Sequence, residues 1–138
     1  MRQPQRMWWA RPRKLCALER PGGGGRSHRP ERRSEEIAWL KSNGVRTVIS
    51  IMGTRHNLAA YDEAGLEWVH APVDDGGEGA ELVPLLRRKL RSAGAVAIHG
   101  DRRTDLVARI CAECLEAVYG VPVEEGLERA AAAGLTAR

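Results

Sequence analysis

Hydrophobic residues along this chain alternate between short β-branched runs and longer stripes of helical spacing. Residues 45–51 (VRTVISI) are largely apolar on both faces, which is typical of a buried central strand. Residues 66–73 and 95–98 predict two further strands. Residues 8–18 predict an edge strand, because Pro12 cannot donate a hydrogen bond to a central ladder.

Helical stripes separate these strands. The clearest begins at Arg103 and Thr104, carries apolar residues alternately one and three positions apart, and stops at Gly120. Four other helices are predicted at residues 34–43 with Ser34 as N-cap, 56–64, 79–93 and 122–133. This alternation predicts an α/β fold, with a central, largely parallel sheet of about four to five strands flanked by helices.

The run Pro21–Gly25 is the strongest break in the pattern, and it predicts a flexible loop that continues to about Pro30. We therefore divide the chain into a basic N-terminal arm with an edge strand and a Gly-rich loop (1–33) and an α/β domain (34–138). A length of 138 residues suits one domain overall. Residues 1–7 are expected to be frayed.

The net charge of +4 is unevenly distributed. Residues 1–33 carry ten Arg or Lys against two Glu, whereas residues 34–138 carry twelve basic against sixteen acidic side chains. Such an arm can contact nucleic acid or acidic lipids through their phosphates. It has no regular basic helix and no aromatic spacing suited to stacking, so the sequence favours a solvated arginine surface over a nucleic-acid partner.

No apolar run approaches the roughly 20 residues of a membrane span. The cluster Met7–Ala10 is too short for a signal-peptide core of about 7–15 residues, so we expect a cytoplasmic protein without a membrane partner. Cys16, Cys111 and Cys114 are an odd number and do not form a disulfide framework. Cys111 and Cys114 lie on the apolar stripe of the long helix, where packing is favoured over catalysis or metal binding.

The segment that follows the strand at 95–98 carries the candidate chemistry. A strand, a tight turn and a helix N-terminus form an anion site, because the first helical N–H groups lack partners and the helix dipole is positive there. The candidate anion-binding residues are Gly100, Asp101, Arg102, Arg103 and Thr104. Two other interpretations stay open: Asp101 or Thr104 caps the helix, and the two arginines form salt bridges with Asp74, Asp75 or Asp105.

His99, a turn and then Arg103-Thr104 resemble the signature loop of cysteine-dependent protein tyrosine and dual-specificity phosphatases. In that family the loop reads His-Cys, five residues, Arg, then Ser or Thr. Here Gly100 stands in the place of the cysteine, and only Asp101 and Arg102 separate it from Arg103. The loop therefore lacks the nucleophile and is about three residues shorter than the family's loop.

Other segments resemble bacterial members of the dual-specificity group in the same order along the chain. The matching pieces are Lys14-Leu15, Arg20–Gly22, Trp39-Leu40, Gly44-Val45, Thr47–Ser50, Ala64–Leu66 and Trp68–Val73. Asp75-Gly76 falls where the family carries its general-acid aspartate. The resemblance implies a phosphatase-like fold, in which His99 would hydrogen-bond the loop.

Glycine offers no thiolate, so a phosphocysteine intermediate is excluded. We expect a pseudophosphatase that binds a phosphorylated protein, a small phospho-ligand or another protein, without a cofactor. An enzyme alternative is hydrolysis without cysteine, using His99 and Asp75 with water or a metal held by nearby aspartates. A third possibility is nucleic-acid contact through the basic arm.

Overall fold

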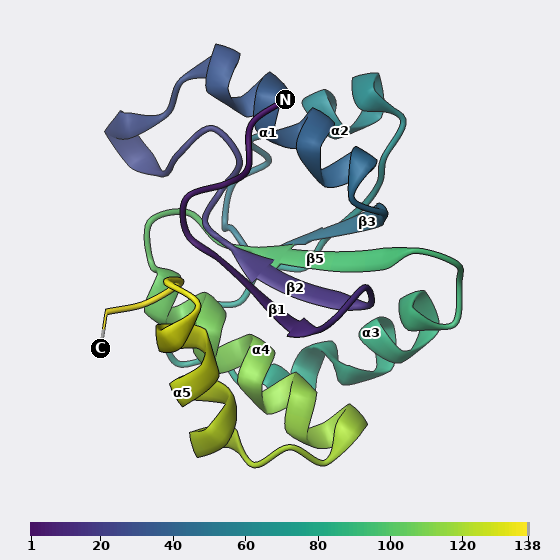
Figure 1. The fold of residues 1–138 in the computed structure, drawn as a ribbon, viewed down its shortest axis with the longest axis vertical. Helices are drawn as coiled ribbons and strands as arrows, with labels where there is room; N and C mark the ends of the chain where they lie inside the picture. The colour runs from purple at the N-terminus through teal and green to yellow at the C-terminus, as the bar shows by residue number, and fades with distance from the viewer. Residues whose placement is uncertain (138) are drawn as a thin grey trace.

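The computed structural model describes residues 1–137 and is built around one five-stranded sheet (Figure 1). The strands lie in the order β1-β2-β5-β3-β4. Only the β1–β2 pair is antiparallel, which confirms the predicted largely parallel sheet. The strands are β1 (Met7–Arg11), β2 (Leu15–Leu18), β3 (Val45–Ser50), β4 (Glu67–His70) and β5 (Ala95–His99).

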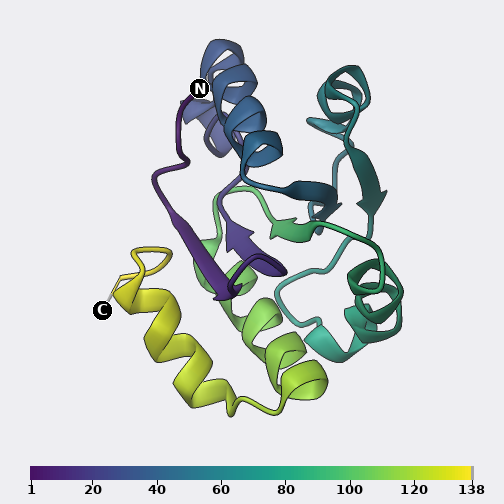
Figure 2. The ribbon, with the colours of Figure 1, turned by 45° about the vertical axis from the view of Figure 1, so that its right-hand side comes forward.

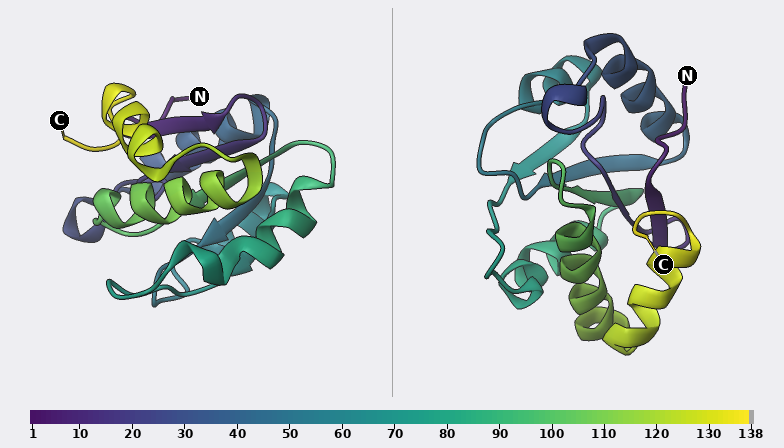
Figure 3. Two further views of the ribbon diagram at one scale, coloured as in Figure 1. Left: turned by 90° about the horizontal axis from the view of Figure 1, so that it is seen from below. Right: turned by 90° about the vertical axis from the view of Figure 1, so that its left-hand side faces the viewer.

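Helices cover both faces of the sheet (Figure 2, Figure 3). One face is covered by α1 (Pro30–Ser42) and α2 (Leu58–Ala64). The other is covered by α3 (Val83–Leu90), α4 (Thr104–Tyr119) and α5 (Val123–Ala132). Two short 3-10 turns complete the fold, η1 (Gly25–Ser27) and η2 (Gly79–Leu82).

Strand β3 shows why the central strands are apolar on both faces. Successive side chains point to opposite sides of a sheet. Val48 accordingly packs with α1 and α2, whereas Ile49 packs with α4, and Ala97 and Ile98 of β5 divide in the same way. Burial on both sides confirms the central strand predicted at 45–51.

Because β2, β5, β3 and β4 are parallel, their ends define two edges of the molecule. We call the segments that follow these strands the carboxyl edge. The segments that precede β2, β3 and β5 are the amino edge. In an open α/β sheet, ligands bind beyond the carboxyl ends of the strands.

The single edge strand predicted at 8–18 is wrong, since the structure has a hairpin there. Lys14 N donates to Arg11 O at 3.0 Å, and Arg13 adopts a φ of 64°, which turns the chain back. The expectation of a frayed 1–7 segment is also wrong. Arg2 N donates to Glu35 O at 3.2 Å, and Pro4 is buried.

Helix α1 begins at Pro30 rather than Ser34, because proline at the first helical position has the φ that a helix needs. Ser34 lies inside the helix, where its hydroxyl donates to Pro30 O. Strand β4 ends at His70 instead of residue 73, although Ala71 and Val73 still donate to β3 and Ile51. Within residues 1–137, none of the helices is long and apolar enough to span a membrane.

Candidate functional site

Four loops meet at the carboxyl edge, and together they form the candidate site. Residues 19–29 follow β2, residues 51–57 follow β3, residues 71–78 follow β4 and residues 100–103 follow β5. Side-chain contacts join all four, as the following paragraphs describe. The predicted site residues are therefore brought to one place by the parallel topology.

Gly100, the residue after His99, is closely packed against Val107 of α4. A Cβ added at this residue would lie 2.8 Å from Cγ2 of Val107, which is inside the contact distance of two carbons. Val107 is β-branched and sits in α4, so its side chain has little rotameric freedom to move away. The packing of α4 against β5 thus leaves little room for a side chain at this position.

The Gly-rich loop closes over the loop after β5. A Cβ at Gly24 would lie 2.6 Å from the carbonyl oxygen of Asp101, so only glycine permits this approach of two backbones. Beside it, Gly25 N donates to Asp101 Oδ1 at 2.9 Å. The carboxylate of Asp101 therefore binds the Gly-rich loop and does not cap α4.

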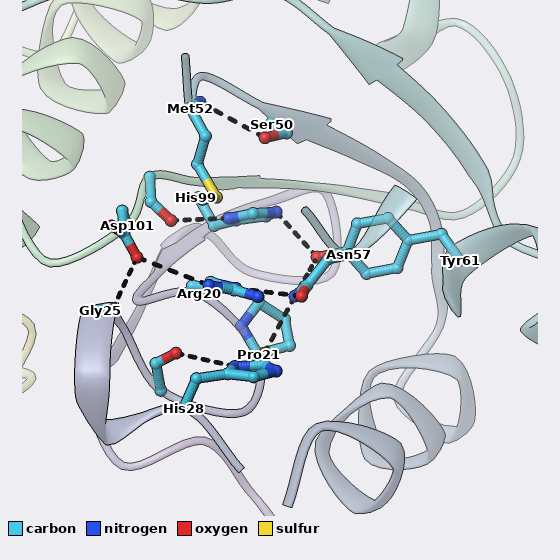
Figure 4. A network of polar contacts seen from close by, with 12 residues as sticks. Arg20, Pro21, Gly25, His28, Ser50, Met52, Asn57, Tyr61, His99 and Asp101 are labelled. Carbon is cyan, nitrogen blue, oxygen red and sulfur yellow. Dashed lines mark hydrogen bonds and ion pairs between the residues drawn. The ribbon is translucent and has the colours of Figure 1, made fainter. Parts of the chain in front are cut away.

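His99 is fully buried at the end of β5, and both ring nitrogens are bonded (Figure 4). Nδ1 lies 2.8 Å from Gly100 O, which can only accept, so Nδ1 carries the proton and donates. Nε2 then accepts from the hydroxyl of Tyr61 at 2.7 Å. Burial lowers the pKa of His99 to about 4 and raises the pKa of Tyr61, so both side chains are neutral near pH 7.

A chain of hydrogen bonds continues from Tyr61 across the site. Asn57 Nδ2 donates to Tyr61 Oη at 3.2 Å and to Pro21 O at 2.9 Å, and Asn57 Oδ1 accepts from Arg20 Nε at 3.0 Å. The Arg20 guanidinium reaches Asp101, with 3.9 Å between Nη1 and Oδ1. Burial lowers the pKa of Arg20, although the Asp101 carboxylate opposes this. The network therefore joins the Gly-rich loop to His99, before the loop that follows β5, and to Asp101 within that loop.

Arg103 binds two carboxylates. Its Nε and Nη2 donate to the two oxygens of Asp105, each at 2.9 Å, and Nη1 donates to Asp75 Oδ2 at 2.8 Å. The Arg103 hydrogen bonds lower the pKa of Asp105 to about 2. For Arg103 the structure thus agrees with the salt-bridge interpretation. Asp75 lies beside the loop after β5, as its place in the sequence predicted.

The prediction that Asp101 or Thr104 caps α4 is wrong. Arg103 occupies the N-cap position without a side-chain capping hydrogen bond, and Thr104 is the first helical residue. The backbone N–H groups of Asp105 and Leu106 face the Asp105 carboxylate and help to lower its pKa. Arg102 is exposed, and within residues 1–137 it forms no ion pair. The start of α4 therefore presents one exposed arginine without an ion pair, while Thr104 N donates to Arg102 O at 3.0 Å.

All three cysteines are unpaired and buried, away from solvent. Burial raises the pKa of each thiol, that of Cys114 to about 12, so none is a thiolate near pH 7. Among residues 1–137, no three His, Cys, Asp or Glu side chains converge in an arrangement suited to a metal ion. The alternative metal cluster around His99 is therefore not assembled.

Solved structures identify the fold. A P. aeruginosa TpbA variant in complex with pTyr superimposes with a TM-score of 0.72 at 19% identity, covering 96% of this chain and 75% of that one. Human DUSP28 gives 0.69 at 16% identity, over 96% and 84% of the two chains. The active form of Tk-PTP gives 0.67 at 14% identity, over 96% and 88%.

The chain has the fold of the protein tyrosine and dual-specificity phosphatases. No protein-family model matches the sequence, and no curated protein matches it either. At these identities the likeness concerns the fold alone. It confirms the α/β architecture and the phosphatase-like fold that the sequence resemblance implied.

Sequence reasoning missed three residues of the polar network, Arg20 as a partner of Asp101 and both Asn57 and Tyr61. Asn57 carried one local signal, since asparagine tolerates the left-handed φ of 74° that it adopts before α2. Glu36 was also missed. Its fully buried carboxylate accepts from Gly22 N and from Arg32 Nε, each at 2.8 Å, and so anchors the Gly-rich loop to α1.

Proposed function

We propose that this protein is a catalytically inactive domain of the phosphatase fold, a pseudophosphatase that acts by binding. The observation that carries this proposal is the packing at Gly100, where a side chain would collide with Val107. The loop from β5 to α4 consists of residues 100–103 alone, and the buried thiols lie elsewhere. A degenerate, shortened loop without a nucleophile accounts for all three facts.

We assign the ligand contacts to Gly100, Asp101, Arg102, Arg103 and Thr104. The positive end of the α4 dipole and the exposed Arg102 support binding of an oxyanion. Asp75, Asp101 and Asp105 oppose it, because they already hold Arg103 and Gly25. The ligand we propose is a phosphate group on a partner, whose other contacts compensate for displacing these carboxylates.

The enzyme alternative draws less support from the geometry. His99 is fully buried, and its Nε2 lone pair is taken by Tyr61, so a water molecule has no access to it. Asp75 is exposed but bound to Arg103. We propose the cytoplasm as the place of action, since three unpaired thiols suit a reducing compartment.

The test is the thermal unfolding midpoint of the protein with added phosphate, sulfate or tungstate. We expect oxyanions to raise the midpoint of the wild type and of Arg6→Ala, and to lose most of this effect in Arg102→Ala. Arg6 is a matched control, an exposed arginine outside the site. An unchanged midpoint in the wild type, or an unchanged response in Arg102→Ala, would contradict the anion site.

Hydrolysis of an aryl phosphate separates the two classes of function. Activity that is abolished by His99→Ala or Asp75→Ala but is indifferent to thiol alkylation would support the enzyme alternative and overturn the non-catalytic proposal.

A further inference from the structure

The amino edge carries a surface that the proposed function does not use. Six exposed arginines belong to three separate segments of this edge. The turn between β1 and β2 and the helix α3 lie on the right-hand side of Figure 1. Helix α3 precedes β5 and ends at this edge, and cations are favoured at a helix C-terminus. These residues, the amino-edge arginines, are Arg11, Arg13, Arg46, Arg87, Arg88 and Arg91.

Contacts between the segments show that the arginines form one surface. Lys14, in the β1–β2 turn, reaches toward the carbonyl oxygens of Ser92 and Gly94 at 3.5 and 3.4 Å. The side chain of Arg46 lies over Gly94. The turn between β1 and β2, the start of β3 and the end of α3 are therefore neighbours.

The same surface contains a shallow groove between α3 and the end of α4. Its volume is about 230 Å³, and Arg87, Arg91 and Tyr119 are among the residues that line it. The Arg11 guanidinium lies 4.6 Å from the centre of the Tyr119 ring, which holds the arginine in place by a cation–π contact. Two arginines thus line a hollow large enough for a phosphate group, and a third contacts the tyrosine that lines it.

None of the six amino-edge arginines forms an ion pair with another residue of the chain between positions 1 and 137. Glu67, the acidic residue of β4, is bound to Lys89 instead. The nearby charge of Arg46 also helps to lower the pKa of Glu67, so this carboxylate offsets part of the charge. The arginines still outnumber it, so the edge is positive and attracts a polyanion.

We propose that the amino edge binds the phosphate backbone of a nucleic acid, without reading its sequence. Guanidinium groups bind phosphate oxygens bidentately, so an arginine-rich surface suits phosphodiesters. A membrane fits less well because no large apolar side chain is exposed at this edge. Within residues 1–137 the exposed ones are Met1 and Leu127, which lie elsewhere. The sequence also leaves open nucleic-acid contact through the basic arm, residues 1–33. The amino-edge surface is a different one, and the arm contributes only Arg11 and Arg13 to it.

The experiment measures fluorescence anisotropy of a labelled DNA duplex of about 20 base pairs between about 50 and 200 mM salt. Arg88→Glu/Arg91→Glu changes the amino edge, and Arg2→Glu/Arg6→Glu changes the charge equally on the N-terminal segment. None of these four side chains makes a hydrogen bond or an ion pair within residues 1–137. Circular dichroism checks that both variants keep the fold.

We expect the wild type to bind with an affinity that falls steeply with salt. The amino-edge variant should bind at least about tenfold more weakly, with a salt slope reduced by about two, while the N-terminal variant changes by less than about threefold. Equal losses in the two variants would show a mere effect of net charge and contradict the proposal. No binding at the lowest salt, or binding only to phosphatidylserine vesicles, would also overturn it.

Discussion

The two edges of the sheet differ in how many of their arginines are paired with carboxylates. At the carboxyl edge, Arg20, Arg32, Arg103 and Arg109 are each paired with carboxylates of the chain. At the amino edge, the six exposed arginines have no such partner within residues 1–137. Within residues 1–137, Arg26, Arg29, Arg55 and Arg102 of the carboxyl edge form no ion pair. The carboxyl edge thus pairs part of its arginines with carboxylates, whereas the amino edge pairs none of its six.

The largest expected effect comes from breaking the buried pairing at the carboxyl edge. Glu36→Ala removes a carboxylate that is fully buried and leaves Gly22 N without an acceptor. We expect the free energy of unfolding to fall by about 3 to 4 kcal/mol in urea titrations, because Gly22 N and the Arg32 guanidinium would lose their buried acceptor. The neighbouring Glu35→Ala, at an exposed position, should change it by less than about 0.5 kcal/mol. Equal effects in the two variants would show that the anchor has no special role.

A second effect is a loss of stability in acid. Burial lowers the pKa of His99 to about 4, below its value of about 6.5 in the unfolded chain. The unfolded state then binds more protons between these values, so this contribution to stability is complete above pH 6.5 and is lost as the pH falls toward 4. The loss amounts to about 3 kcal/mol.

Unfolding titrations between pH 7 and 4 on the wild type and two variants measure this loss. His99→Gln should flatten the dependence over this window, whereas His56→Gln, at an exposed position, should leave it unchanged. If the free energy of unfolding of His99→Gln still falls between pH 7 and 4, carboxylates and not His99 cause the loss.

Adding a side chain at Gly100 should have the next largest effect on stability. Gly100→Cys introduces a Cβ 2.8 Å from Cγ2 of Val107, and overpacking of this kind costs about 1 to 3 kcal/mol. Val107→Ala makes room, so the two changes should couple in a double-mutant cycle, with Val107→Ala costing less in the cysteine background. Additive costs would mean that Val107 does not close the site.

The smallest effect concerns the exposed carboxylate of Asp75. Asp75→Asn releases Nη1 of Arg103, and the affinity for phosphate should rise about two- to fivefold, as for an exposed ion pair. Asp74→Asn removes the same charge one residue away, where the side chain binds only Gly76 N. Isothermal titration calorimetry should show a larger gain in phosphate affinity for Asp75→Asn than for Asp74→Asn. An equal gain in both variants would mean that only the net charge matters.

The sequence predicted the central strands, the long helix and the place of the candidate loop, because hydrophobic periodicity and the Gly and Pro breaks are local signals. The hairpin was missed because its turn uses Arg13 with a positive φ, a conformation that arginine rarely adopts. The start of α1 was missed because the Gly-rich run was extended too far, up to Pro30.

The contacts that define the two edges join residues far apart in sequence. The pairing of Arg103 with Asp75, 28 positions away, was one of several salt bridges that the sequence left open. The pairing of Arg20 with Asn57, 37 positions away, leaves no local pattern. Counting charge by segment also did not reveal the amino-edge surface, because Arg11 and Arg13 meet the end of α3 only in the folded protein. Both features follow from parallel strand order, which hydrophobic spacing does not specify.

The most direct test of the central claim is ³¹P nuclear magnetic resonance of the purified wild-type protein incubated with a phosphotyrosine peptide. Binding without chemistry predicts a phosphate monoester signal that shifts with added protein and keeps its area. A growing signal of inorganic phosphate that disappears in Asp75→Ala would contradict the claim and show that the carboxyl edge is an active site.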